Sequence, residues 1–264
     1  MKLKTWLNDW INVYKKPFVK PHTLQNIKGI IKLYIPENLK NKKLDEISAL
    51  DLQKTINNVS KSRTRLDIYD ILNNAFSLAF KFDLINKDIA SLLDKPKHKK
   101  EHSIPLTLDE INTFLSTIKD SRCEYYFTFM LYSGCRRSEG LNLLWEDIDE
   151  EKGLIHIRGT KTDNSDRFIP YFDDLKILFS KIKRNGNKVF RHKKDYVSKQ
   201  FKLYCPNHKL KDLRTTFCTR CCECGVNIKV AQKWMGHNSI KTTADIYMQV
   251  SRDFILSEAN KFFI

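Results

Sequence analysis

Four side chains in the C-terminal part of the sequence have the types and the spacing that phosphodiester chemistry needs. Lys211 and Arg214 form a Lys-x-x-Arg pair, His237 follows Gly236, and Tyr247 comes ten residues later. Lysine, arginine and histidine donate hydrogen bonds to phosphate oxygens, and arginine does so in a two-pronged geometry. A tyrosine can act as a covalent nucleophile. The set therefore indicates attack of a tyrosine on a phosphodiester.

Three short helices are needed to bring these groups together. In the first segment an apolar residue recurs every four positions, at Leu213, Phe217 and Cys221. This spacing predicts a helix with Arg214 near its start, and Gly225 fits the position just beyond its end. A second helix is expected over residues 227–234, and Gly236 ends it so that the following histidine lies on a turn. A third short helix, over residues 242–249, is expected to carry the tyrosine.

A further arginine motif lies about 80 residues upstream, in the run Ser-Gly-Cys-Arg-Arg-Ser-Glu over residues 133–139. Gly134 is expected to make a turn after an aromatic helix. Glu139, one helical turn beyond the arginines, could orient one of them or cap the next helix. By composition alone, either Arg136 or Arg137 could be the reactive one.

In two short segments, residues 154–158 and 167–171, apolar and polar residues alternate as in β-strands. These segments flank the turn-forming sequence Gly-Thr-Lys-Thr-Asp-Asn-Ser. This pattern predicts a β-hairpin. Lys161 is the lysine of its loop. On the residues alone, a hairpin lysine is more often a solvated charge than a functional group.

Taken in order, these motifs resemble the two conserved boxes of the tyrosine recombinase (phage integrase) family. The second box reads roughly His-x-Leu-Arg-His-Thr-Phe, then Leu-Gly-His, Thr-Thr and Tyr. Its matches here are Leu213, Arg214, Thr216, Phe217, Gly225, Gly236, His237, Thr242, Thr243 and Tyr247. The first box, Thr-Gly-x-Arg-x-x-Glu, resembles residues 133–139 and selects Arg136 over Arg137. Three positions depart from the pattern: Lys211 and Thr215 replace histidines, and Met235 replaces a leucine.

The resemblance implies an active site of six residues, namely Arg136, Lys161, Lys211, Arg214, His237 and Tyr247. The two arginines and His237 would bind the non-bridging phosphate oxygens, and Tyr247 would attack to give a 3′-phosphotyrosyl link. Lys161 would protonate the leaving 5′-oxygen, and Lys211 is the candidate base for the phenol. The departure at Lys211 leaves the rate and the pH profile open. The resemblance implies no metal and no cofactor.

The expected fold is mainly α with a small β-hairpin sheet, in two domains. Residues 1–94 read as four to five helices with basic faces and resemble the core-type DNA-binding domain of the family. Residues 95–104 read as a basic linker. Residues 105–264 are expected to form the α+β catalytic domain.

The charge of the chain points to a polyanionic partner, which we expect to be double-stranded DNA. The net charge is +16 over 264 residues, and basic proteins of this kind bind nucleic acid through phosphate contacts. No segment approaches the roughly 18 apolar residues of a membrane span, and no charged-then-apolar leader opens the chain. We therefore expect a cytoplasmic protein of a prokaryotic or phage-host cell, without membrane attachment.

A cluster of cysteines invites a zinc hypothesis. The candidate ligands are Cys205, His208, Cys218, Cys221, Cys222 and Cys224. Zinc sites usually place a Cys-x-x-Cys pair on a turn. Here the cysteines fall at helical spacing, and a thiol packs as a small apolar group. The pattern favours core packing over a metal site. Seven cysteines, an odd number, indicate reduced thiols.

The last segment, residues 251–264, carries an apolar stripe at helical spacing, formed by Ile255, Ala259, Phe262 and Phe263. It could fold back on its own domain. The family resemblance instead suggests that it docks on the neighbouring protomer of a homotetramer that holds two DNA sites together. Whether an accessory DNA-bending protein takes part is left open.

The function that these observations favour is site-specific DNA recombination, with integration or excision of a mobile element. One alternative is an enzyme like the type IB topoisomerases, which share the chemistry without pairing two sites. Another is a DNA-binding protein whose catalytic set has decayed. All six positions carry chemically competent residues, which argues against the second alternative.

Overall fold

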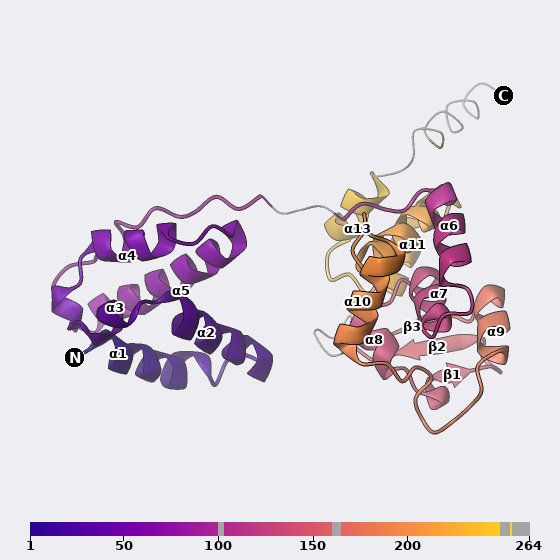
Figure 1. Ribbon diagram of the computed structural model, residues 1–264, viewed down its shortest axis with the longest axis horizontal. Helices are drawn as coiled ribbons and strands as arrows, with labels where there is room; N and C mark the ends of the chain where they lie inside the picture. The colour runs from indigo at the N-terminus through magenta and orange to yellow at the C-terminus, as the bar shows by residue number, and fades with distance from the viewer. Residues whose placement is uncertain (100–102, 160–164, 249–253, 255–264) are drawn as a thin grey trace. The chain divides into compact units, whose positions relative to one another are not determined.

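The computed structural model describes residues 1–99, 103–159, 165–248 and 254, and the chain forms two compact units, Met1–Glu101 and His102–Ile264. Helices dominate both units, and the second also holds a small antiparallel sheet (Figure 1). The prediction of a mainly α fold with a small sheet is confirmed. The division between the units falls within the predicted basic linker.

The N-terminal unit is a bundle of helices around one apolar core. Its elements are α1 (Leu3–Trp10), a π-helical segment η1 (Ile11–Lys15), α2 (Pro21–Tyr34), α3 (Glu37–Asn41), a 3-10 turn η2 (Leu44–Glu46), α4 (Ala49–Asn57) and α5 (Ser62–Lys81). Both α2 and α4 pack on α5, and α1 packs on α3. The indole N–H of Trp6 donates to the carbonyl of Ala75 at 2.9 Å, which ties α1 to α5. Ser48 begins α4 with a capping box formed with Asp51.

The second unit packs eight helices, among its described residues, with a three-stranded sheet. These helices are α6 (Leu108–Ile118), α7 (Glu124–Ser133), α8 (Arg137–Asn142), α9 (Asp173–Ser180), α10 (Lys194–Tyr204), α11 (Asp212–Glu223), α12 (Ile228–Met235) and α13 (Ile240–Tyr247). Trp145–Asp147 forms a 3-10 turn, η3. Helix α7 contacts α6, α8, α9 and α11, so its aromatic residues lie at the centre of the core.

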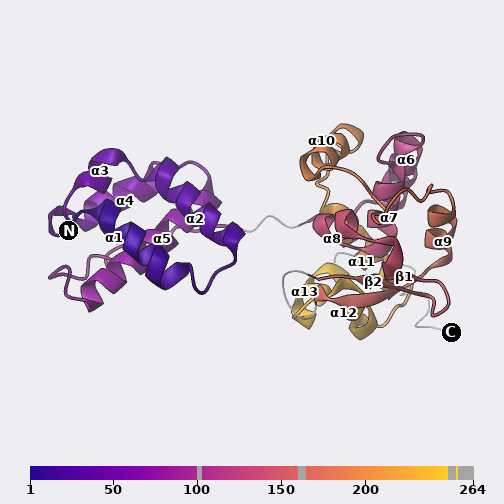
Figure 2. The same cartoon turned by 90° about the horizontal axis from the view of Figure 1, so that it is seen from below.

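The sheet has the order β1-β2-β3, with β1 at Ile148–Asp149, β2 at Leu154–Ile157 and β3 at Arg167–Pro170, all antiparallel. The hairpin of β2 and β3 matches the sequence prediction. The strand β1 is not predicted, because two residues are too few to show an alternation. Figure 2 shows α12 and α13 on the side of the unit where the sheet lies, and α12 packs on β3.

Gly134 allows α7 to end where α11 and α12 pass close by. Its φ of 62° lies in the left-handed region that favours glycine. A Cβ at this position would lie 2.5 Å from Cδ1 of Phe217 and 3.0 Å from the sulfur of Met235. The turn therefore depends on the absence of a side chain, both for its backbone angle and for its contact with α11.

In the parts of the chain that the structure describes, no helix is long and apolar enough to cross a bilayer.

Candidate active site

The C-terminal end of α12 is the point at which the sequence motifs converge. The carbonyls of its last turn belong to Trp234, Met235 and Gly236, and each accepts a hydrogen bond from a different arginine. Arg167 donates to the first, Arg214 to the second and Arg136 to the third, the last at 3.2 Å. The carbonyls at a helix C-terminus are unpaired and carry a partial negative charge that favours cations. Three segments far apart in the sequence are thus joined at one helix end.

Arg136 is held by a carboxylate of its own motif. It is the N-cap residue of α8, and its Nη1 donates to Oε1 of Glu139 at 2.7 Å. The Arg136 backbone N–H donates to Oε2 of Glu139 at 2.9 Å. Arg137, the alternative left open by composition, donates instead to the hydroxyl of Ser198 on α10. Of the two, only Arg136 joins the cluster at α12.

Arg214 lies in the first turn of α11 and is largely buried. Its Nη1 donates to the carbonyl of Gly134 at 2.7 Å, which links the two arginine motifs directly. Burial, and after it the positive charges of Arg136 and Arg167, lowers the pKa of Arg214 to about 9. A pKa this low means that the charged form of Arg214 is disfavoured, both by its removal from water and by the neighbouring positive charges. An anion at this place would relieve both costs.

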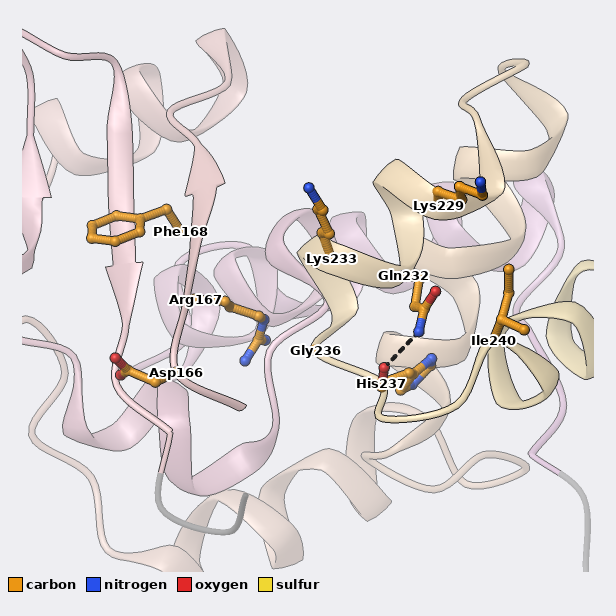
Figure 3. Close-up of a pocket in the computed structure, with 9 residues that line it drawn as sticks. All are labelled: Asp166, Arg167, Phe168, Lys229, Gln232, Lys233, Gly236, His237 and Ile240. Atoms are coloured by element: carbon orange, nitrogen blue, oxygen red, sulfur yellow. Dashed lines mark hydrogen bonds between the residues drawn. The ribbon is translucent and has the colours of Figure 1, made fainter. Parts of the chain in front are cut away.

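His237 is presented on the predicted turn, because Gly236 ends α12 with a φ of 60°. Its Nδ1 lies 2.9 Å from the hydroxyl of Thr243, and the side-chain amide of Gln232 donates to its carbonyl at 3.0 Å (Figure 3). Burial and the three nearby arginines lower the pKa of His237 to about 3. The ring is therefore neutral at physiological pH. If the hydroxyl of Thr243 donates to Nδ1, the proton lies on Nε2 and is available to an acceptor.

Two hollows open beside this cluster. One is lined by Arg136, Lys211 and Arg214, and Lys211 itself is exposed at the start of α11. The other is lined by Arg167 and His237 together with Lys229 and Lys233 of α12, as Figure 3 shows. The two lysines of α12 add positive charge at the mouth of the second hollow.

Tyr247 ends α13, but its hydroxyl points to neither hollow. It donates instead to the carbonyl of Val226 at 3.0 Å. The ring packs against a small apolar cluster that includes Cys218 and Cys221, both buried. Burial, followed by the neighbouring cysteines, raises the pKa of the Tyr247 phenol above its ordinary value. In this conformation the phenol is tied to the backbone and is not aimed at the arginines.

The two cysteines next to Tyr247 behave as apolar packing groups. Burial raises the pKa of Cys218 and of Cys221 to about 12, so both remain thiols. Within the described residues no three or more His, Cys, Asp or Glu side chains gather to hold a metal ion.

Two predicted features lie outside the described residues: Lys161 of the hairpin loop and the apolar stripe of residues 251–264. The strands β2 and β3 that flank the loop are described. The structure thus brings together Arg136, Arg214 and His237, with Lys211 at one hollow.

Arg167 is the member of the cluster that the sequence analysis misses. It opens β3, where the residues at 167 and 169 are buried and Phe168 is exposed. An arginine at an inward-facing position of an alternating strand is the signal that could have identified it, because charged residues are almost never fully buried unless paired.

The geometry can be set beside known proteins. Residues 104–253 match the phage integrase family, and residues 2–60 match the N-terminal SAM-like domain of phage integrases. The chain belongs to the phage integrase family. The first match alone covers more than half of the chain.

Several relatives of known name are tyrosine recombinases. The tyrosine recombinase XerA of Pyrococcus furiosus is 31% identical over 205 residues, which cover 69% of each protein. A tyrosine recombinase of Pseudothermotoga lettingae is 26% identical over 259 residues, which cover 87% of each.

Solved integrase structures share the fold. A lambda integrase dimer bound to a COC′ core site superposes with a TM-score of 0.81 at 20% identity, over 93% of this chain and 77% of the other. A lambda integrase tetramer bound to a Holliday junction gives a TM-score of 0.78 at 21% identity, over 90% of this chain and 78% of the other. At this identity the likeness concerns the fold.

We predict that His237 stays neutral while the pH of the free protein is lowered from about 8 to about 4, because its pKa lies near 3. In the unfolded chain the ring takes up a proton near pH 6.5, so this residue lowers the free energy of unfolding as the pH falls from about 6.5 toward 3. NMR titration of ¹⁵N-labelled histidine measures the pKa, and the signal lost in His237→Asn assigns it. A midpoint near 6.5 would contradict the prediction.

Proposed function

We propose that this phage integrase family member is a site-specific DNA recombinase that cuts and rejoins duplex DNA through a 3′-phosphotyrosyl intermediate. It would integrate or excise a mobile element. The observation that carries the proposal is the convergence of Arg136, Arg214 and His237 at the end of α12, one short helix before Tyr247 in the chain. The names of the relatives, and the DNA in the integrase structures of the same fold, support the same function.

The arginines would act by exchanging acceptors. Without DNA, Arg136 and Arg214 donate to the carbonyls of Gly236 and Met235. A phosphodiester in the adjoining hollow offers charged oxygens, which are stronger acceptors than carbonyls. Negative charge on these oxygens grows in the five-coordinate transition state, where fixed donors stabilise it most. The Nε2–H of His237 would add a further donor.

Tyr247 would become the nucleophile only after its hydroxyl leaves the carbonyl of Val226. Its oxygen then forms a bond to phosphorus while the bond from phosphorus to the 5′-oxygen breaks, leaving a 3′-phosphotyrosyl link and a free 5′-hydroxyl. A phenol with an ordinary pKa of about 10 is mostly protonated at neutral pH, so a base is needed. We assign this role to Lys211, because it lines the hollow beside Arg136 and Arg214. Lys161 would donate a proton to the leaving 5′-oxygen.

Because the phosphotyrosyl link keeps the energy of the phosphodiester, rejoining would need no nucleotide. In the second step a 5′-hydroxyl attacks phosphorus and releases the phenol. A 5′-hydroxyl from the partner site completes an exchange, whereas the original one restores the substrate.

We predict that Tyr247→Phe abolishes the covalent adduct formed on a nicked suicide duplex, because the attacking oxygen is gone. Duplex affinity should stay within about threefold, since phosphate contacts dominate binding. The adduct is measured by denaturing gel and the affinity by titration. Tyr204→Phe, on α10, is the matched control and should cleave normally. A persistent adduct in Tyr247→Phe would remove this residue from the mechanism, and absence of any adduct in the parent protein would overturn the enzymatic function.

Lys161→Ala should slow cleavage of an ordinary duplex by about 100-fold or more, because general acids contribute about 10²–10⁴-fold. A substrate with a 5′-sulfur leaving group needs little protonation, so it should restore most of the rate. Arg136→Ala is the contrast, and the 5′-sulfur substrate should not restore its cleavage rate, because a better leaving group does not replace a lost phosphate ligand. Normal cleavage of the oxygen substrate by Lys161→Ala would assign the acid to another residue.

The C-terminal stripe of residues 251–264 is proposed to dock on the next protomer of a homotetramer that pairs two DNA sites. An apolar groove on the second unit supports this, and its walls include Leu108, Phe172, Phe217, Val226 and Trp234. Leu108 is 57% exposed at the edge of this apolar groove, so its side chain is accessible to a second chain that docks there. Val226, whose carbonyl accepts the hydrogen bond of Tyr247, lies in the wall of this groove. Docking there would therefore affect the placement of Tyr247.

Ending the chain after Gln249 should leave single-site cleavage intact but abolish joining of two DNA duplexes. The groove variant Leu108→Glu should lose the same step, because a carboxylate cannot be buried without a partner. Leu203→Glu is the matched control, since Leu203 is 72% exposed on α10 and lies outside the groove. A truncated protein that is unfolded as a monomer would show that the stripe belongs to its own core.

A further inference from the structure

We propose that Arg167 is a positioning residue of this active site. It would hold Glu139 and the end of α12 in place while Arg136 and Arg214 turn to the phosphate. The inference rests on the proposed recombination chemistry, and it concerns a residue that lies outside both sequence boxes.

All three nitrogens of the Arg167 guanidinium donate to protein acceptors. The Nε–H donates to the carbonyl of Trp234, Nη1 to the carbonyl of Ser165 at 3.0 Å, and Nη2 to Oε2 of Glu139 at 3.0 Å. The side chain is only 5% exposed. A planar guanidinium can satisfy three separate acceptors in fixed directions, which a lysine cannot do. Arg167 thereby joins β3, α8 and α12.

Glu139 is the link between Arg167 and the substrate-binding arginine. Its side chain is 4% exposed, and its two oxygens accept from Arg167 and, twice, from Arg136. The positive charge of Arg167 and these hydrogen bonds hold the pKa of Glu139 below its ordinary value against the effect of burial. Without Arg167, the buried carboxylate would have one cationic partner left. It would then hold Arg136 more tightly and withdraw it from the phosphate.

The hydrogen bond from Arg167 to the carbonyl of Trp234 supports the turn that presents His237. When Arg136 and Arg214 exchange the carbonyls of Gly236 and Met235 for phosphate oxygens, the end of α12 loses two of its three arginine donors. Arg167 is too deeply buried to follow them and keeps the carbonyl of Trp234. The turn that presents His237 would then stay in place throughout the reaction.

The test is single-turnover cleavage of a nicked suicide duplex at saturating protein, measured together with duplex affinity, in Arg167→Gln and Arg167→Lys. We expect Arg167→Gln to cleave about 100-fold more slowly, the order of loss that a misplacement of about 1 Å causes. Its affinity should stay within about threefold. Arg167→Lys keeps the charge beside Glu139 but not the other two bonds, so it should recover about tenfold of the rate. Arg158→Gln is the matched control and should cleave normally, because the half-exposed Arg158 side chain pairs with Glu146 and Asp147 and not with the arginine cluster.

A second-site variant separates positioning from support of the fold. Replacing Glu139 by Gln in the Arg167→Gln background removes the carboxylate that would restrain Arg136, so cleavage should rise above that of Arg167→Gln alone. Cleavage at the parent rate in Arg167→Gln, or a fall in affinity that matches the fall in rate, would overturn the proposal. If Arg167→Gln does not fold, the reduced rate and unchanged affinity expected of Arg167→Lys decide the question. Because the parent protein forms the adduct in the same assay, failure here is distinct from failure of the proposed function.

Discussion

The second unit depends on one electrostatic arrangement, in which three buried or half-buried arginines meet at the end of one helix and two of them, Arg136 and Arg167, share a single buried carboxylate. Removing cations from water is costly unless nearby groups compensate for the lost hydration. Glu139 offsets one positive charge, and the carbonyls at the end of α12 supply partial negative charge to all three guanidinium groups. An excess of positive charge remains and, after burial, it contributes to the lowered pKa of Arg214. On the proposed mechanism, a phosphodiester would complete the balance.

Burial makes His237 and Tyr247 differ in how ready they are to react. Burial, and after it the charges of the arginines, keeps the imidazole neutral, and its Nδ1 lies 2.9 Å from the hydroxyl of Thr243, so the ring needs no rearrangement to donate a hydrogen bond. The phenol lies in an apolar setting near Cys218 and Cys221, where its ionised form is disfavoured. On the proposed mechanism, binding and chemistry would thus be separated in the fold: the proposed phosphate ligands are already assembled, and the proposed nucleophile, Tyr247, is held apart from them.

The sequence predicted what local pattern determines. Helical spacing and glycines located α11, α12 and α13, and the structure starts α13 at Ile240 because the side chain of Ser239 caps it by accepting from the backbone N–H of Lys241. What the sequence did not reveal are contacts between distant segments. In the sequence, Arg167 cannot be distinguished from a surface charge, and only the structure shows that its side chain faces inward from β3. The hydrogen bond from Tyr247 to the carbonyl of Val226 joins residues that are distant in the sequence, so no local pattern predicts it. The helices α9 and α10 were not predicted, since their role is to cover a core whose shape only the tertiary packing defines.

The strength of the hydrogen bond between Tyr247 and Val226 determines how strongly this bond can hold the phenol in its present position. A hydrogen bond of this kind contributes about 0.5–1.5 kcal/mol net, so this bond by itself leaves a minor but accessible population of molecules with the phenol released. A partner that favours the released state could raise the cleavage rate through this bond by a factor of about ten at most. On the proposed mechanism, this hydrogen bond would slow cleavage by a lone protomer without abolishing it, and assembly would amplify that background only modestly.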